Sequence, residues 1–132
     1  MDPQGNASSG LGVNLRANQK GVYELLADDA YLDQVIYPTE IDTLKIIPSN
    51  ADLAGAEIEL VERDQREQIL SVALNGVNEE YEFVVIDCPP SLGLLTLNAL
   101  TASQSVLIPM QCEYYALQGL SHLLKTLQRI KK

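Results

Sequence analysis

The stretch EFVVIDCPP at positions 82–90 places an unbroken apolar run directly before one acid, Asp87, and a pair of prolines. A continuous apolar run predicts a strand buried on both faces, which is typical of a parallel sheet covered by helices. In such sheets ligands bind at the carboxyl ends of the strands, where Asp87 would lie. Because an isolated charge in a dry core is costly, this placement favours a carboxylate that holds a metal bound to phosphates. An aspartate before Pro-Pro also suits a helix N-cap, and both interpretations stay open at this point.

The composition fits one domain and disfavours several functional classes. The chain has 132 residues, of which 46% are hydrophobic, enough for one domain with a core. No run approaches the roughly 20 apolar residues of a membrane span and no signal peptide is recognisable, so we expect a cytoplasmic protein without membrane contact. A net charge of −9 disfavours a broad nucleic-acid surface. Cys88 and Cys112 are too far apart for a Cys-x-x-Cys metal pair; we expect reduced thiols, and a disulfide stays open.

Helical and strand patterns alternate along the chain. Segment 4–14, rich in Gly, Ser and Asn, is expected to be a loop. The expected helices cover 22–26, 31–36, a stretch from Asn50 or Asp52 to 61, 69–74, 94–100 and 117–130, and the expected strands cover 44–48, 82–87 and 105–109. Strands separated by helices imply parallel pairing through right-handed crossovers. The pattern therefore predicts an α/β fold, a doubly wound and mostly parallel sheet with helices on both faces.

A phosphate-binding loop is absent from the sequence. Chains that bind nucleotide phosphates in this fold begin with a strand, a Gly-rich loop ending in Lys-Ser/Thr, and a helix, yet no G-x-x-x-x-G-K-[ST] occurs here. We therefore expect no complete nucleotide site from this chain alone.

Four tracts carry a family resemblance. They are DPQGNASSGLG at 2–12, NADLAGAE at 50–57, IDCPPSLG with LNAL at 86–93 and 97–100, and PMQCEYYALQGL at 109–120. In this order and spacing they resemble the ParA/Soj family of chromosome- and plasmid-partitioning ATPases, of the deviant Walker A class. The resemblance implies an incomplete P-loop NTPase-like fold, with 1–132 as a single partial ATPase domain containing switch I, the Walker B strand with switch II, and the following strand and helix.

The resemblance also implies roles for individual residues. Asp87, as the Walker B aspartate, would hold magnesium, and Asp2 would be the catalytic acid that orients the attacking water. The implied cofactor-binding residues are Gln4, Gly5 and Asn6 in switch I, Asp87, and Pro89 in switch II. Without the family match, an Asp before Pro near a chain end is a solvated turn residue, and glycines nearby indicate only a flexible loop.

For the full-length protein the resemblance implies ATP and Mg²⁺ as cofactors, nucleotide-dependent pairing with a second copy, a centromere-binding ParB-type partner, and nucleoid association through DNA-binding regions absent here. Against the family pattern, the chain begins inside an Asp-x-Asp motif and does not contain the two phosphate-binding lysines. We therefore expect little or no ATP hydrolysis by the chain alone, and low stability or self-association because strand edges are exposed. The alternatives are a non-catalytic interaction module and a MinD-like positioning ATPase.

Overall fold

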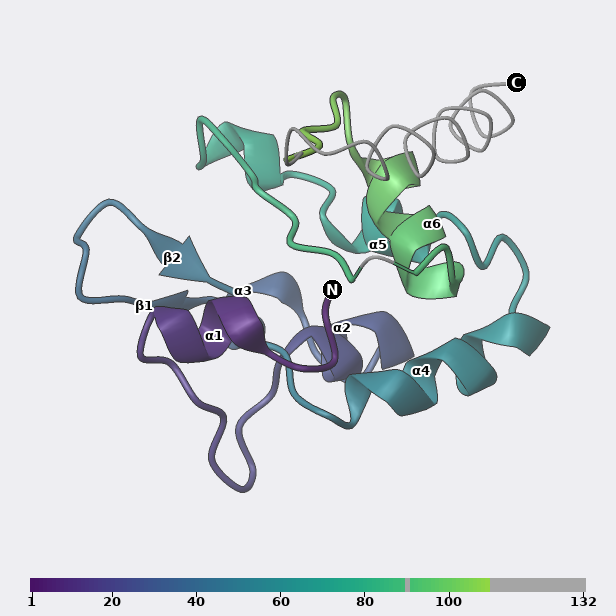
Figure 1. Cartoon of the computed structure of the whole chain (residues 1–132), viewed down its shortest axis with the longest axis horizontal. Coiled ribbons are helices and arrows are strands. Elements are labelled where there is room, and N and C mark those ends of the chain that lie inside the picture. Colours follow the sequence, from purple (N-terminus) through teal and green to yellow (C-terminus); the bar gives the residue numbers. More distant parts are fainter. Residues whose placement is uncertain (90, 110–132) are drawn as a thin grey trace, which may run out of the picture. The chain divides into compact units, whose positions relative to one another are not determined.

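The structure is a computed structural model that describes residues 1–89 and 91–109 (Figure 1). The chain divides into two compact units, Met1–Ala102 and Ser103–Lys132. All helices and strands of the described residues belong to the first unit. The expected helix at 117–130, together with Cys112, lies outside the described residues.

The first unit is mainly helical. Its elements are α1 (Asn6–Gly10), α2 (Val22–Ala27), α3 (Leu32–Val35), α4 (Leu53–Glu59), η1 (Leu60–Glu62), α5 (Ile69–Ala73), η2 (Val77–Glu79) and α6 (Leu94–Ala102). The helices expected over 22–26, 31–36, 69–74 and 94–100 are confirmed, and the stretch to residue 61 forms α4 and η1. Asp52 is the N-cap residue of α4, but its carboxylate accepts from the Asn50 side-chain amide at 2.9 Å instead of capping the helix.

The apolar faces of these helices form one core. Its buried side chains are Met1, Val22, Leu26, Leu53, Ala56, Leu60, Leu70, Leu95 and Ala99. Removing each of the larger ones from water stabilises the fold by about 1.5–3 kcal/mol. Ile86 and Cys88 also pack against this core. Because Met1 precedes Asp2, and Ile86 and Cys88 flank Asp87, the core fixes the backbone beside both acids.

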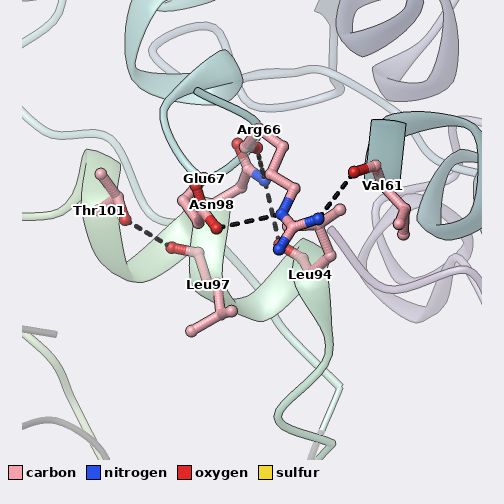
Figure 2. A network of polar contacts seen from close by, with 7 residues as sticks. All are labelled: Val61, Arg66, Glu67, Leu94, Leu97, Asn98 and Thr101. Carbon is pink, nitrogen blue, oxygen red and sulfur yellow. Dashed lines mark hydrogen bonds and ion pairs between the residues drawn. The ribbon is translucent and has the colours of Figure 1, made fainter. Parts of the chain in front are cut away.

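Buried Asn98 joins α6 to the segment before α5 (Figure 2). Its Nδ2 donates to the Arg66 carbonyl at 2.8 Å and to the Leu94 carbonyl at 3.0 Å. Its Oδ1 accepts from the Leu70 amide at 3.0 Å. Nδ2 therefore donates two hydrogen bonds and Oδ1 accepts one, so no polar atom of this buried side chain lacks a partner.

The expectation of a loop throughout 4–14 is wrong, because α1 forms within it. Ser8 in α1 is buried, and its Oγ accepts from the Ser49 amide at 3.0 Å. Gly5 before the helix has a φ of 64°, and Gly12 after it has a φ of 72°. The helix thus depends on a contact with a distant segment and on left-handed glycines, neither of which hydrophobic periodicity reports.

The strand predictions are only partly confirmed. Residues 44–48 contain β2 (Lys45–Ile46), which pairs with β1 (Tyr37–Pro38), but the pairing is antiparallel and not the parallel one expected. Residues 82–87 and 105–109 form no strand within the described part of the chain. Phe83 is 78% exposed and Val85 is 92% exposed, so burial on both faces is wrong for this structure. A strand needs a hydrogen-bonded neighbour, whereas a helix bonds within itself, and no such neighbour lies beside these runs in the described residues.

None of the helices that the structure describes combines the length and the apolar character needed to cross a bilayer.

Candidate functional site

A pocket of about 560 Å³ brings together the two acid-bearing loops. It is lined by Asp2, Pro3, Gln4, Asn6, Ala54, Glu57, Asp87, Cys88, Pro89, Ser91 and Leu95. All the site residues predicted from the sequence line this pocket except Gly5. Gly5 belongs to the first loop and is buried. The loops come from opposite ends of the first unit, so the fold and not the sequence spacing produces this grouping.

The Asp2 side chain is held by its own loop. Its Oδ1 accepts from the Gln4 amide at 2.9 Å, and its Oδ2 accepts from the Asn6 side-chain amide at 2.9 Å. The same Asn6 amide also donates to Gln4 Oε1 at 3.2 Å. These bonds orient the carboxylate while the residue remains partly exposed at the pocket, so it stays accessible to water or a ligand.

Gly5 allows this loop to lie against the segment that leads into α4. The Ser49 hydroxyl donates to the Asp2 carbonyl at 2.7 Å. A Cβ at Gly5 would lie 2.7 Å from the Ser49 carbonyl oxygen, and Gly5 also has a φ of 64°. Both the close approach and the left-handed conformation require glycine at this position.

Asp87 is exposed and lines the same pocket. Helix α6 begins at Leu94, so its N-cap position is Gly93, and Asp87 does not cap it. This excludes the cap interpretation, which the sequence had left open. The segment between Asp87 and α6 is held near its end by the Thr96 hydroxyl, which donates to the Ser91 carbonyl at 2.6 Å.

The charged side chains that line the pocket are all acidic. Asp2, Glu57 and Asp87 contribute carboxylates, and the described lining residues include no Lys, Arg or His. Burial raises the pKa of the Cys88 thiol, and the nearby Asp87 and Asp2 carboxylates raise it further, against an opposing effect of the α-amino group. Cys88 is therefore a thiol at neutral pH and not an activated nucleophile.

The donor set fits one mode of magnesium binding better than another. Within the described residues, no group of three or more His, Cys, Asp or Glu side chains could hold a metal ion by itself. Mg²⁺ keeps several waters and is usually bound through one or two carboxylates plus substrate phosphates. An exposed Asp87 that lines the same pocket as Asp2 suits that mode, whereas a cage made only of protein ligands does not fit.

Glu57 is the acidic residue of the pocket to which the sequence assigned no role. The tract at 50–57 indicated only family likeness, and the acid lies on a helix that carries no other pocket acid. A usable signal was present at α6, which begins after a glycine that has no side chain to cap it. Such a helix start calls for a capping acceptor from elsewhere in the fold.

Comparisons with known proteins agree on the family. The whole chain, residues 1–132, matches the family model described as AAA domain (AAA_31). It is 54% identical over 132 residues to the sporulation initiation inhibitor protein Soj of Bacillus subtilis, covering 100% of this chain and 52% of that protein. It is 53% identical over 132 residues to the chromosome partitioning protein ParA of Myxococcus xanthus, covering 100% and 47%. A solved cobyrinic acid a,c-diamide synthase from Mycobacterium smegmatis, with bound ATP analog and magnesium, is 39% identical with a TM-score of 0.91, covering 98% of this chain and 53% of that one.

The chain spans about half the length of the curated relatives it matches. The structural match confirms the predicted fold class, an α/β P-loop NTPase-like fold that is incomplete here. In that solved relative the fold holds an ATP analog and magnesium. The chain belongs to the AAA domain family (AAA_31), and its sequence is similar to those of the Soj and ParA partitioning proteins.

Proposed function

We propose that the pocket between the Asp2 and Asp87 loops is the part of a MgATP site that this chain contributes to a ParA/Soj-type partitioning ATPase. In this proposal Asp87 holds Mg²⁺ through a water, and Asp2 orients the water that attacks the γ-phosphate. Gln4, Gly5 and Asn6 belong to switch I, and Pro89 belongs to switch II. The observation that carries the proposal is the presence of both carboxylates in one pocket of about 560 Å³.

The chemistry of phosphoryl transfer suits such an arrangement. The reaction depends mainly on positioning and on stabilisation of charge, and little covalent work is asked of the protein. The bonds from Gln4 and Asn6 fix the direction of the Asp2 carboxylate, as a water-orienting role requires. Bound Mg²⁺ would neutralise charge on the phosphates, and the exposed Asp87 carboxylate is free to hold one of its waters.

The acidic pocket also explains why we expect the chain alone to be inactive. A triphosphate brings several negative charges beside Asp2, Glu57 and Asp87, and the described lining residues supply no cation to offset them. We propose that residues 1–132 are one partial domain, and that the cations come from the rest of a longer protein. Pairing with a second copy, binding of a ParB-type partner and non-specific DNA, and a nucleoid location in the cytoplasm are proposals for that longer protein.

The test uses the longer protein and compares two substitutions with a control. Asp87→Asn is expected to remove the part of ATP-induced thermal stabilisation that depends on Mg²⁺, while Asp2→Asn keeps this stabilisation and abolishes hydrolysis. The control is Asp42→Asn, an exposed acid outside the pocket, which should change neither measurement. Unchanged Mg²⁺ dependence in Asp87→Asn would contradict the proposal. Hydrolysis by the 132-residue chain at the rate of the longer protein, lost in Asp87→Ala, would show that the missing lysines do not matter.

The exposed apolar run at Phe83 and Val85 favours a second candidate, a non-catalytic module that binds a protein partner. Apolar side chains exposed side by side are typical of interaction surfaces. Partner binding that is unaffected by nucleotide, in a protein that MgATP does not stabilise, would favour this module over the ATPase.

A further inference from the structure

Helix α6 begins without a capping side chain of its own. Gly93 occupies its N-cap position, and the Leu97 amide donates to the Gly93 carbonyl at 3.0 Å. The amide of Leu95, the second helical residue, instead donates to Glu57 Oε1 of α4, at a long 3.5 Å. This is one of the two amides that a capping oxygen ordinarily satisfies, and a negative carboxylate is also favoured at a helix N-terminus. Glu57 therefore caps α6 from a different helix.

The space around Gly93 is shaped by this contact. The three atoms closest to the position of a Cβ at Gly93 all belong to the carboxylate group of Glu57, the far end of a flexible side chain, so a side chain at position 93 would displace that carboxylate. The φ of Gly93 is not in the left-handed region, so its backbone conformation is open to other residues. Glycine at 93 is needed for the approach of Glu57 and not for the turn.

The contact connects the two loops of the pocket through α4. On one side, Ser49 lies shortly before α4 and binds the Asp2 carbonyl at 2.7 Å. On the other side, Glu57 holds the start of α6, where Thr96 in turn binds the Ser91 carbonyl at 2.6 Å. Segments that carry Asp2 and Asp87 are thus both attached to the same short helix and its approach.

We propose that Glu57 is a positioning residue, which ties the Asp87 loop to α4 and so keeps Asp87 at a fixed distance from Asp2. The tie follows from the contacts described above, and its consequence for Mg²⁺ binding rests on the proposed function. Glu57 acts on the loop through the α6 backbone and does not itself bind the metal. A cap supplied locally at residue 93 would stabilise α6 equally well but would leave the loop untied from α4.

That difference defines the experiment on the 132-residue chain. The variants are Glu57→Ala, Gly93→Ser, the double variant, and Glu62→Ala, a control that removes an exposed acid from η1. Thermal unfolding reports the stability of the fold. Alkylation of Cys88 by iodoacetamide, separated from Cys112 by peptide mass spectrometry, reports how well the Asp87 loop is held.

Gly93→Ser should affect stability differently in the wild type and in the Glu57→Ala background. Gly93→Ser alone leaves the unfolding temperature close to that of the wild type, because its side chain displaces the flexible Glu57 carboxylate and the new hydroxyl takes over the cap. In the Glu57→Ala background the same change raises it, because the new hydroxyl caps the helix. Alkylation of Cys88 becomes about fivefold faster in Glu57→Ala, the factor expected for loss of a typical cap. It stays fast in the double variant although stability has returned, and Glu62→Ala matches the wild type.

Two results on this chain would overturn the inference. In the first, Cys88 reacts at the wild-type rate in Glu57→Ala. In the second, the double variant recovers both stability and slow alkylation, so that Glu57 is a replaceable cap without a positioning role.

A parallel measurement on the longer protein separates this inference from the proposed function. The double variant should need about fivefold more Mg²⁺ for half-maximal stabilisation by ATP, the same factor as the increase expected in the alkylation rate of Cys88. An unchanged Mg²⁺ requirement would overturn the positioning role. Absence of MgATP stabilisation in the wild type would reject the proposed function, while the alkylation result would still decide the tie.

Discussion

Replacing Asn98 with alanine is expected to destabilise the helical core strongly. The side chain is fully buried, and it connects α6 to the Arg66 carbonyl and to the Leu70 amide at the start of α5 (Figure 2). Alanine leaves both of these backbone groups without the side chain that they bond. The helix α6 itself can persist, because alanine is a better helix former than asparagine. The loss therefore falls on the attachment of α6 to α5.

The magnitude follows from the groups left without a partner. The Leu70 amide is buried, and an unsatisfied buried donor costs about 1–3 kcal/mol. The Arg66 carbonyl is part-buried and can recover some hydration, so its loss is about 1 kcal/mol. Together these predict a fall of about 2–4 kcal/mol in the free energy of unfolding, a large share of the 5–15 kcal/mol typical of a domain.

Equilibrium urea unfolding followed by circular dichroism measures this change. The matched control is Thr101→Ala, on the same helix, whose exposed hydroxyl donates to the Leu97 carbonyl at 2.8 Å (Figure 2). We expect the control to change the free energy of unfolding by less than about 0.5 kcal/mol. A loss below about 1 kcal/mol for Asn98→Ala would refute the reasoning, because it would mean that the two groups find other partners. Failure of Asn98→Ala to fold where Thr101→Ala folds agrees with the prediction.

Three further outcomes are expected. Gly21→Ala should lower the free energy of unfolding, measured in urea, by about 1–3 kcal/mol, because its Cβ collides with the Pro48 carbonyl. Gly10→Ala is the control and should raise that free energy by about 0.5 kcal/mol, because a Cβ there meets only open space. The alkylation rate of Cys88 should reach half its alkaline maximum above pH 9.0, since its pKa is raised; a midpoint below that value contradicts this. In sedimentation velocity, Val85→Lys should reduce self-association of the chain, and unchanged association would show that the exposed apolar run is not responsible.

The helices were predictable because their signal is local. The spacing of Leu25 and Leu26, or of the leucines along 94–100, reports one apolar face, and a helix satisfies its backbone within itself. The absence of a strand at 82–87 was not predictable, because the sequence there is a strong strand pattern. Pairing depends on what lies beside the run, and no neighbouring strand is present among the described residues. The short helix α1 was missed for a related reason, since the contact between Ser8 and Ser49 that supports it spans distant positions.

The candidate site was predictable where motifs report it and not where packing creates it. The tracts around Asp2 and Asp87 named the two loops, and the structure places both acids at one pocket. Their roles in chemistry remain predictions. Glu57 was overlooked because the positioning role proposed for it depends on the contact between α4 and α6, which no spacing along the chain encodes.

The exposure of Asp87 in this structure keeps its carboxylate hydrated. The preceding apolar residues are uncovered, with Val85 at 92% exposure, so water reaches the carboxylate and an isolated charge costs little. If the rest of a longer protein covers this run, the same carboxylate loses hydration, and a bound cation then becomes the means of offsetting that loss. Covering the apolar run and binding Mg²⁺ would then favour each other, because a ligand that binds one state stabilises that state. The chain alone should therefore bind Mg²⁺ more weakly than the longer protein does, even though both contain Asp87.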